Sequence, residues 1–237
     1  MKKTKIIATL GPVSFNEETI LGLINNGMDV ARINMSHYNE NVDLDKHIRF
    51  IREQTKKINR NVAILFDLGG PKIRVGKVDS GTIKIKKGSH YTLGGTNCDI
   101  PLNKKLSFDS YTSGGEVKVN DGSLSFKIVE VENNILKLLA YTSGEISSGK
   151  GVNFPGVKLD LPSLTEKDKA DLQLAVELGA DWLAMSFVRS ANDYSIINKE
   201  LERLGASIPV IAKIEKPEAI DNLGAIIDSF DGILVAR

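Results

Sequence analysis

Residues 26–31, NGMDVA, and residues 178–183, LGADWL, share one pattern, in which a helix ends at a glycine and an aspartate precedes a strand. The first copy follows a helix that carries Ile20, Leu23 and Ile24 on one face. The run 62–66, VAILF, is continuously apolar, as expected of a strand buried on both faces. Repeated strand–helix units of this kind predict a parallel sheet with right-handed crossovers.

Three strands are predicted before residue 70 and three after residue 156: 5–10, 28–33, 62–66, 181–185, 209–212 and 231–235. The glycine fingerprint of a doubly wound dinucleotide-binding sheet is missing, because Gly11-Pro12-Val13-Ser14 follows the first strand. We therefore predict an α/β fold, an incomplete (β/α)8 barrel of the TIM type with about six of its eight strands.

Residues 71–155 differ in sequence pattern from the rest of the chain. Strand-type alternation replaces helical periodicity there, and 11 of the 21 glycines lie in this segment. Asn120-Asp121-Gly122 is a hairpin-type turn between two alternating runs. We predict an inserted all-β lid domain. The predicted organisation is 1–70, first part of the barrel domain; 71–155, the lid; and 156–237, second part of the barrel domain.

Two helix starts are predicted from capping residues. Ser14 and Glu17 have the spacing of a capping box, and Thr165 opens a helix that carries Asp168 in its first turn.

Charge and cysteine content exclude several classes of protein. The 237 residues contain 31 Lys+Arg and 30 Asp+Glu, so a net charge of +1 predicts neither nucleic acid nor membrane as a partner. The single cysteine, Cys98, excludes an internal disulfide and a cysteine-rich zinc site. No apolar run approaches the roughly 18 residues of a membrane span. We predict a reduced, cytoplasmic protein.

The carboxyl ends of the predicted strands are rich in groups that bind anions and metals, and chemistry in a TIM barrel collects at those ends. Guanidinium and ammonium groups suit phosphate and carboxylate. Ordinary surface charge is the alternative explanation for any one of the arginine and lysine side chains. The strand-end residues that can bind anions or metals are Arg32, Asn34, Ser36, Asp67, Arg74, Ser186, Lys213, Glu215 and Arg237.

Lys213 and Glu215 point the same way in an ideal strand. The carboxylate can bind Mg²⁺, and the ammonium can neutralise charge on a transferring phosphoryl group. A salt-bridged strand end explains the pair equally well. Asn34, Ser36, His37 and Asp67 offer oxygen ligands and an imidazole, although Ser36 could instead begin the next helix as a cap.

Several stretches, taken in order along the whole chain, closely resemble the pyruvate kinase family: 4–12, TKIIATLGP; 27–37, GMDVARINMSH; 67–74, DLGGPKIR; 150–153, KGVN; 161–168, LPSLTEKD; 186–189, SFVR; and 213–215, KIE. The resemblance implies a (β/α)8 domain with a β-barrel lid inserted after the third strand. It also implies phosphoryl transfer from phosphoenolpyruvate to ADP, giving pyruvate and ATP, with Mg²⁺ or Mn²⁺ as cofactor. For a full-length form it implies a homo-oligomer, usually a tetramer.

The same resemblance implies roles for individual residues. Arg32 and Lys213 would be catalytic and would bind the substrate, with Phe187 and Arg189 lining its pocket. Glu215 would hold the divalent cation. The residues implied in binding the nucleotide are Asn34, His37, Arg74, Lys150 and Asp121.

Two departures from the family pattern carry expectations. Many members hold K⁺ with residues matching Asn34, Ser36, Asp67 and a threonine, where this chain has Leu68. Lys72 stands where a glutamate is frequent and could supply the missing positive charge, so we predict activity without K⁺. The family motif also continues past Arg237 with a glycine and a metal-binding aspartate. We therefore expect the sequence to be an N-terminal portion with little or no turnover alone.

Three alternatives remain open from the sequence. A related Mg²⁺-dependent lyase acting on pyruvate-like acids would use the same arginine and carboxylates. An aldolase would use Lys213 as a Schiff-base lysine. A degenerate half-barrel would bind a nucleotide or a partner subunit without catalysis.

Overall fold

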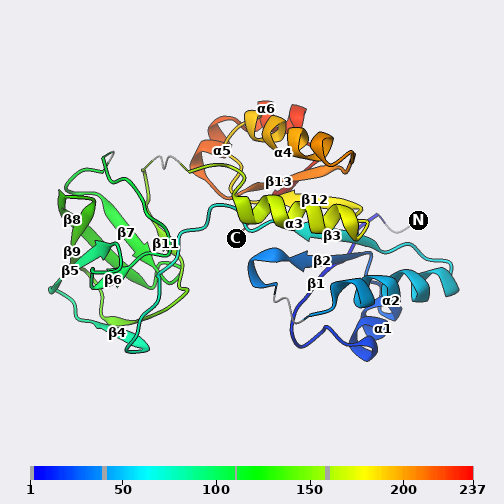
Figure 1. Ribbon diagram of the computed structural model, residues 1–237, viewed down its shortest axis with the longest axis horizontal. Coiled ribbons are helices and arrows are strands. Elements are labelled where there is room, and N and C mark those ends of the chain that lie inside the picture. Colours follow the sequence, from blue (N-terminus) through cyan, green and yellow to red (C-terminus); the bar gives the residue numbers. More distant parts are fainter. Residues whose placement is uncertain (1–2, 39–41, 110, 158–160, 237) are drawn as a thin grey trace. The chain divides into compact units, whose positions relative to one another are not determined.

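The computed structural model describes residues 3–38, 42–109, 111–157 and 161–236. The chain divides into two compact units, which are drawn in Figure 1. The barrel unit comprises Met1–Pro71 and Pro162–Arg237, and the inserted unit comprises Lys72–Leu161. The sequence placed the end of the insertion at residue 155. The chain leaves the inserted unit later because Phe154 is buried in its core, and Val157 and Leu161 pack against that core.

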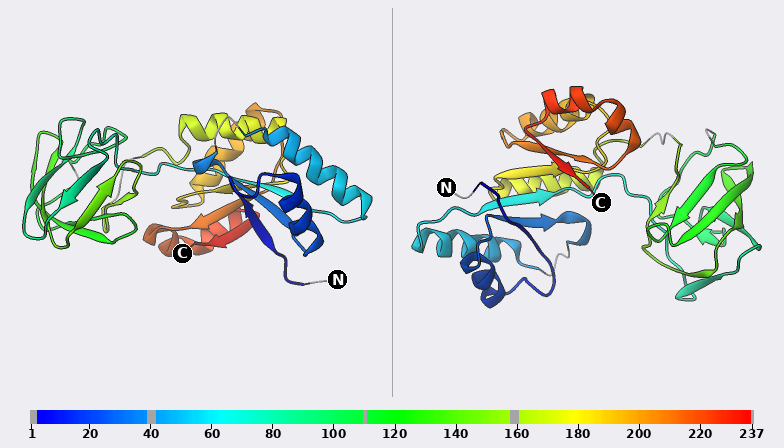
Figure 2. Two further views of the ribbon diagram at one scale, coloured as in Figure 1. Left: turned by 90° about the horizontal axis from the view of Figure 1, so that it is seen from below. Right: turned by 180° about the vertical axis from the view of Figure 1, so that it is seen from behind.

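The barrel unit contains one parallel sheet of six strands in the order β1-β2-β3-β12-β13-β14. The sheet curls into part of a barrel, as predicted (Figure 2). Strand β3 pairs directly with β12, so the strands before and after the insertion meet in the middle of the sheet. The strands are β1 (Ile7–Leu10), β2 (Val30–Asn34), β3 (Ala63–Asp67), β12 (Trp182–Met185), β13 (Val210–Ile214) and β14 (Gly232–Val235).

Helices connect these strands and cover their apolar side chains. Helix α2 buries Leu44, Ile48, Ile51 and Thr55, the face that its sequence periodicity predicts. The helices are α1 (Glu17–Asn25), α2 (Leu44–Lys57), α3 (Glu166–Glu177), α4 (Asn192–Arg203), α5 (Pro217–Asp221) and α6 (Leu223–Ser229), with a 3₁₀ turn η1 (Met35–His37).

The two predicted helix starts have different outcomes. Helix α1 begins after Asn16, whose side chain accepts a hydrogen bond from the Thr19 amide. The predicted Ser14 cap is wrong, because the Ser14 hydroxyl bonds the backbone of Gly11 instead and closes the turn before the helix. Helix α3 begins with a full capping box between Thr165 and Asp168.

The inserted unit is built from strands and turns throughout its described residues, and it has its own apolar core. Asn120 and Asp121 both have positive φ in the turn that joins β7 to β8, as a tight hairpin turn requires. One sheet has the order β11-β7-β8-β9-β5-β6, and β10 pairs with β4. The strands are β4 (Thr82–Ile85), β5 (His90–Gly94), β6 (Ile100–Pro101), β7 (Glu116–Val119), β8 (Leu124–Glu132), β9 (Ile135–Ala140), β10 (Gly144–Ser147) and β11 (Val152–Asn153).

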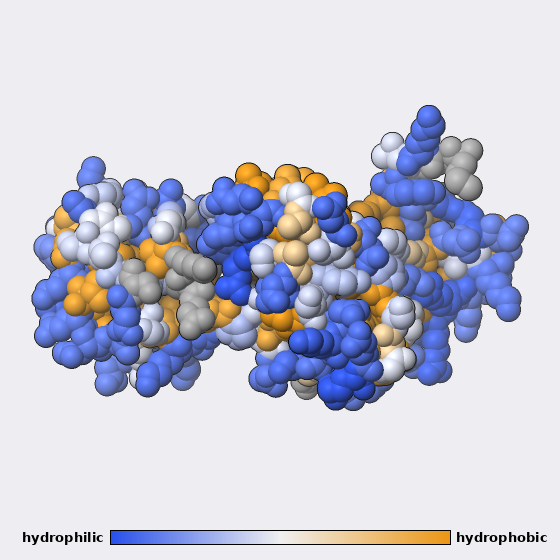
Figure 3. Space-filling model, turned by 90° about the horizontal axis from the view of Figure 1, so that it is seen from above, coloured by the Kyte–Doolittle hydropathy of each residue, from blue (hydrophilic) through white to orange (hydrophobic). Residues whose placement is uncertain are grey.

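On the face shown in Figure 3, hydrophilic side chains predominate and hydrophobic ones form separate patches. Among the helices of the described ranges, each is too short or too polar to cross a membrane.

Candidate active site

The carboxyl edge of the parallel sheet brings together residues that lie far apart in the sequence. Arg32 lies on β2, Asp67 ends β3, and Lys213 lies on β13. Parallel strands present the same end at one edge of a sheet, so these side chains can meet once the strand order is set.

Asp67 is the centre of this cluster. Its Oδ2 accepts a hydrogen bond from Arg32 Nε at 2.9 Å and a second one from Arg32 Nη2, so the guanidinium engages it through two nitrogens. Its Oδ1 lies 3.1 Å from Lys213 Nζ. The Asp67 side chain is only 2% exposed, and two cations therefore balance a carboxylate that water scarcely reaches.

Lys213 has a polar neighbour for each of its three N–H groups. Its Nζ lies 2.7 Å from Ser186 Oγ, 3.1 Å from Asp67 Oδ1 and 3.2 Å from Glu215 Oε1. Lys213 and Glu215 therefore lie on the same side, as their two-residue spacing predicts. Arg32, Asp67, Lys213 and Glu215 form one cluster with balanced formal charge, which we call the strand-end ion cluster.

Phe187 joins this cluster through its backbone. Its amide donates to Glu215 Oε2 at 2.9 Å, and its φ of 59° lies in the left-handed region that non-glycine residues rarely adopt. Gly70 packs against it so closely that a β-carbon there would lie 2.8 Å from the Phe187 ring. The Lys216 ammonium lies 5.5 Å from the centre of the same ring. The Phe187 backbone thus helps to orient the Glu215 carboxylate.

Arg189 belongs to a neighbouring network. Its Nη2 donates to Ser163 Oγ at 2.5 Å, and Ser163 in turn donates to Asp193 Oδ1. Asp193 Oδ2 accepts from the amides of Arg189 and Ser190. Ser163 and Asp193 are buried, so this network fixes the chain after β12.

Asn34 ends β2, and Ser36 lies in the 3₁₀ turn η1 that follows. The Asn34 side chain accepts from the Ser36 amide at 3.1 Å and caps the 3₁₀ turn, so capping does occur here, with Asn34 as the cap. A β-carbon at Gly69 would lie 3.0 Å from Ser36 Oγ, which places Ser36 beside the glycine turn after β3. The His37 side chain lies outside the described part of the structure.

Four predicted residues belong to the inserted unit: Lys72, Arg74, Asp121 and Lys150. Arg74 Nη1 donates to the Gly149 carbonyl at 2.7 Å, and its amide donates to Asn103 Oδ1. Asp121 lies in the hairpin turn between β7 and β8. The roles of Arg74, Asp121 and Lys150 toward a nucleotide, and of Lys72 in place of K⁺, remain predictions.

The carboxylates at the carboxyl edge of the sheet are the groups there that could bind a divalent cation. Within the described ranges, no group of three or more histidine, cysteine, aspartate or glutamate side chains is arranged to hold a metal ion. Mg²⁺, however, is commonly bound through one or two carboxylates together with substrate phosphates and water. Glu215, whose Oε1 and Oε2 meet only one N–H each in the contacts above, fits that requirement.

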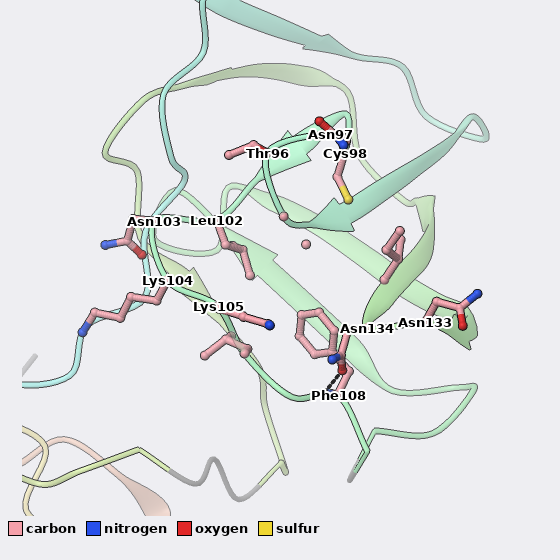
Figure 4. A pocket seen from close by; sticks show the side chains of 14 residues that line it. Thr96, Asn97, Cys98, Leu102, Asn103, Lys104, Lys105, Phe108, Asn133 and Asn134 are labelled. Atoms are coloured by element: carbon pink, nitrogen blue, oxygen red, sulfur yellow. Dashed lines mark hydrogen bonds between the residues drawn. The ribbon is translucent and has the colours of Figure 1, made fainter.

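A hollow of about 450 Å³ lies within the inserted unit (Figure 4). Leu102 and Phe108 contribute apolar surface, and Asn134 accepts from the Phe108 amide at 3.2 Å. Cys98 also lines the hollow, and burial raises the pKa of its thiol. A raised pKa disfavours the thiolate, which is the nucleophilic form of cysteine.

Two residues near the cluster received no role from the sequence. Ser186 was noted only as a strand-end hydroxyl, yet it contacts Lys213. Asp168 was recognised as a helix-start residue, yet its Oδ1 also accepts from the Gly70 amide at 2.9 Å. The sequence signal for Ser186 is its position directly after a strand, and that for Asp168 is only its place in the first turn of α3. The partners of both residues come from other segments.

Known proteins resemble this chain along its whole length. The family model described as "Pyruvate kinase, barrel domain" matches residues 1–237. The chain belongs to the pyruvate kinase family. Pyruvate kinase 2 of Synechocystis sp. is 40% identical over 247 residues, which cover 100% of this chain and 41% of the relative.

Two further pyruvate kinases match along the full chain. The enzyme of Corynebacterium glutamicum is 38% identical, with 50% of its length covered, and that of Geobacillus stearothermophilus is 37% identical, with 41% covered. The chain thus spans about half the length, or less, of these curated relatives. Family members generally use a divalent metal.

Proposed function

We propose that this chain provides the substrate site of an enzyme that transfers a phosphoryl group from phosphoenolpyruvate to ADP. The bond between phosphorus and the enol oxygen breaks, and a bond forms from phosphorus to a β-phosphate oxygen of ADP. The enolate that remains takes up a proton at its methylene carbon, giving pyruvate beside ATP. The strand-end ion cluster is the observation that carries this proposal.

The roles of Arg32 and Lys213 follow from charge and access. Phosphoryl transfer depends mainly on positioning the reactants and neutralising their charge. The Arg32 side chain is 25% exposed and can bind a substrate oxygen while Asp67 still holds it. Lys213 lies deeper, and its fixed ammonium suits stabilisation of the transferring phosphoryl group and the enolate.

Glu215 would hold the divalent cation, Mg²⁺ or Mn²⁺, together with substrate oxygens. The bound cation supplies positive charge beside the transferring phosphoryl group. Phe187 and Arg189 would line the substrate pocket. For the nucleotide, the proposed contacts are Asn34, His37, Arg74, Lys150 and Asp121.

The monovalent-type site of Asn34, Ser36 and Asp67 is proposed to work without K⁺. Leu68 has no side-chain oxygen, and its side chain is buried in the apolar core of the barrel unit. Lys72 would provide the positive charge. We further propose a cytoplasmic enzyme that works as a homo-oligomer.

The test measures the formation of pyruvate from phosphoenolpyruvate and ADP in the presence of Mg²⁺. Pyruvate is detected by coupling its reduction to the oxidation of NADH. The measurement is made with this chain and, if the reading frame continues, with the longer product. Replacement of Lys213 by alanine should lower kcat by a factor of about 10²–10³, since it removes a fixed charge from the transition state. Lys169→Ala is the matched control, because Lys169 pairs with Glu166 on an exposed helix face.

Other results would favour the alternatives. ADP binding without pyruvate formation, in the longer product as well, would indicate a non-catalytic nucleotide-binding protein. Borohydride trapping of pyruvate on Lys213 would indicate Schiff-base chemistry instead.

A further inference from the structure

Ser186 connects the proposed catalytic lysine to the backbone of another strand. It follows β12 directly and is only 3% exposed. Its Oγ lies 2.7 Å from Lys213 Nζ and 2.7 Å from the Leu68 carbonyl oxygen. A buried hydroxyl with two short contacts has a defined hydrogen-bonding role.

The direction of both hydrogen bonds follows from the chemistry of the partners. An ammonium can only donate, so the Ser186 hydroxyl accepts from Lys213. The hydroxyl has one hydrogen, and the carbonyl of Leu68 can only accept it. Asp67 Oδ1 is the other acceptor nearby, but at 3.5 Å it is much farther from Ser186 Oγ.

The Leu68 carbonyl is itself held in place. The Leu68 amide donates to the Ala184 carbonyl of β12 at 2.9 Å, which fixes this residue against the neighbouring strand. The two hydrogen bonds therefore connect the fixed Leu68 carbonyl, through the Ser186 hydroxyl, to the Lys213 ammonium.

The two carboxylates alone would not fix the ammonium in the same way. Asp67 and Glu215 lie 3.1 and 3.2 Å from Lys213 Nζ, and attraction between charges depends weakly on direction. The contact with the Ser186 hydroxyl is the shortest of the three, and it restrains the ammonium from a third direction. The three contacts together define where the ammonium lies.

We infer that Ser186 is a positioning residue, which holds the Lys213 ammonium at the point where the transferring phosphoryl group gathers charge. This inference rests on the proposed function for its reaction, and on the geometry alone for the position of the ammonium. Ser186 need not touch the substrate.

The kinetic test compares Ser186→Ala and Ser186→Cys in the protein that shows phosphoryl transfer. Cysteine keeps the side-chain volume and is only a weak acceptor, so both variants should lower kcat by about 10- to 100-fold. The KM for phosphoenolpyruvate should change less than about threefold, because ground-state binding is retained. Thr55→Val, which removes a buried hydroxyl from α2, should leave kcat unchanged.

Two kinetic outcomes would overturn the inference. Full kcat in Ser186→Cys with a low kcat in Ser186→Ala would mean that packing, and not the hydroxyl, matters. Unchanged kcat in both variants would mean that the ammonium needs no such support.

A second measurement works without turnover. The ¹H–¹⁵N signal of the Lys213 ammonium, assigned by its loss in Lys213→Arg, should exchange with water several-fold faster in Ser186→Ala. If the exchange rate is unchanged, the positioning role fails whatever the activity. If the native protein has no transferase activity but the exchange rate rises, only the proposed function fails.

Discussion

Asp67 Oδ1 lies 3.1 Å from Lys213 Nζ, although the whole inserted unit and helices α3 and α4 separate the two residues along the chain. Asp67 holds Arg32 through its other oxygen. One buried carboxylate thus links cations from two strands, and both the stability of the barrel unit and the placement of its charges depend on it.

Replacing Asp67 by asparagine should destabilise the chain by about 3–5 kcal/mol, because it leaves the buried Lys213 and the partly buried Arg32 without their shared partner. Urea unfolding of the native chain and the variant measures the change. Asp45→Asn is the control, since Asp45 pairs with Arg49 on the surface of α2 and should cost about 1 kcal/mol or less. Equal losses in the two variants would contradict a special role for the buried carboxylate.

Gly70→Ala should be more harmful than Gly179→Ala, although both glycines have a φ of +68°. Alanine at either position is strained by about 1 kcal/mol. A β-carbon at Gly70 would also lie 2.8 Å from the Phe187 ring, whereas Gly179 has open space, so Gly70→Ala should lose about 1–3 kcal/mol more. Thermal unfolding of both variants measures the difference. Identical melting temperatures would show that Phe187 moves aside freely.

Lys72→Glu should make phosphoryl transfer depend on K⁺. The native protein should work equally well in K⁺ and in tetramethylammonium if, as proposed above, Lys72 provides the positive charge in place of K⁺. The rate of pyruvate formation in the two salts measures this. Lys77→Glu is the control, since Lys77 is exposed and paired with Asp79. Strong K⁺ stimulation of the native protein would refute the prediction.

Tyr111→Phe should stabilise the inserted unit by about 1 kcal/mol. The Tyr111 hydroxyl is buried among Phe108 and Phe154, and it has no hydrogen-bond partner within the described ranges. Removing an unpaired buried hydroxyl removes a desolvation cost. Tyr91→Phe is the matched control with the opposite sign, because the Tyr91 hydroxyl accepts from the Lys86 amide at 2.8 Å. Equal effects from the two substitutions in thermal unfolding would contradict the assignment.

The same tyrosine predicts how stability changes at high pH. Burial raises the pKa of Tyr111 well above its ordinary value of 10. Above pH 10 the unfolded chain therefore loses this proton while the folded chain keeps it, so the free energy of unfolding falls as the pH rises. Urea unfolding between pH 9 and 11 should show a smaller decline in Tyr111→Phe than in the native chain. An equal decline would mean that Tyr111 titrates alike in both states.

Much of the fold could be predicted because its signals are local. The apolar positions of α2 lie on one helical face within the sequence itself, and Leu44, Ile48 and Ile51 are buried as that pattern predicts. Alternation and turn residues likewise predicted the all-β character of the inserted segment. The start of α1 was wrong because Ser14 and Asn16 both suit a cap, and only the backbone path decides between them.

The candidate site was predicted in part. Lys213 and Glu215 could be paired from their spacing, since two residues on one side of a strand are close whatever surrounds them. The role of Asp67 between Arg32 and Lys213 could not be predicted, because no spacing in the sequence relates residues on different strands. Ser186 was visible as a polar residue at a strand end, but its contact with Leu68 depends on how β3 and β12 pair.

The sequence by itself determined where most strands and helices form, though not the cap of α1, and which chemical groups stand at the strand ends, because these follow from neighbours along the chain. The tertiary structure alone decided which of those groups meet. Pairing of β3 with β12, and of β12 with β13, brings Asp67, Ser186 and Lys213 within hydrogen-bonding distance. Contacts at 3 Å depend on strand order and register, and these are set by the packing of the whole sheet.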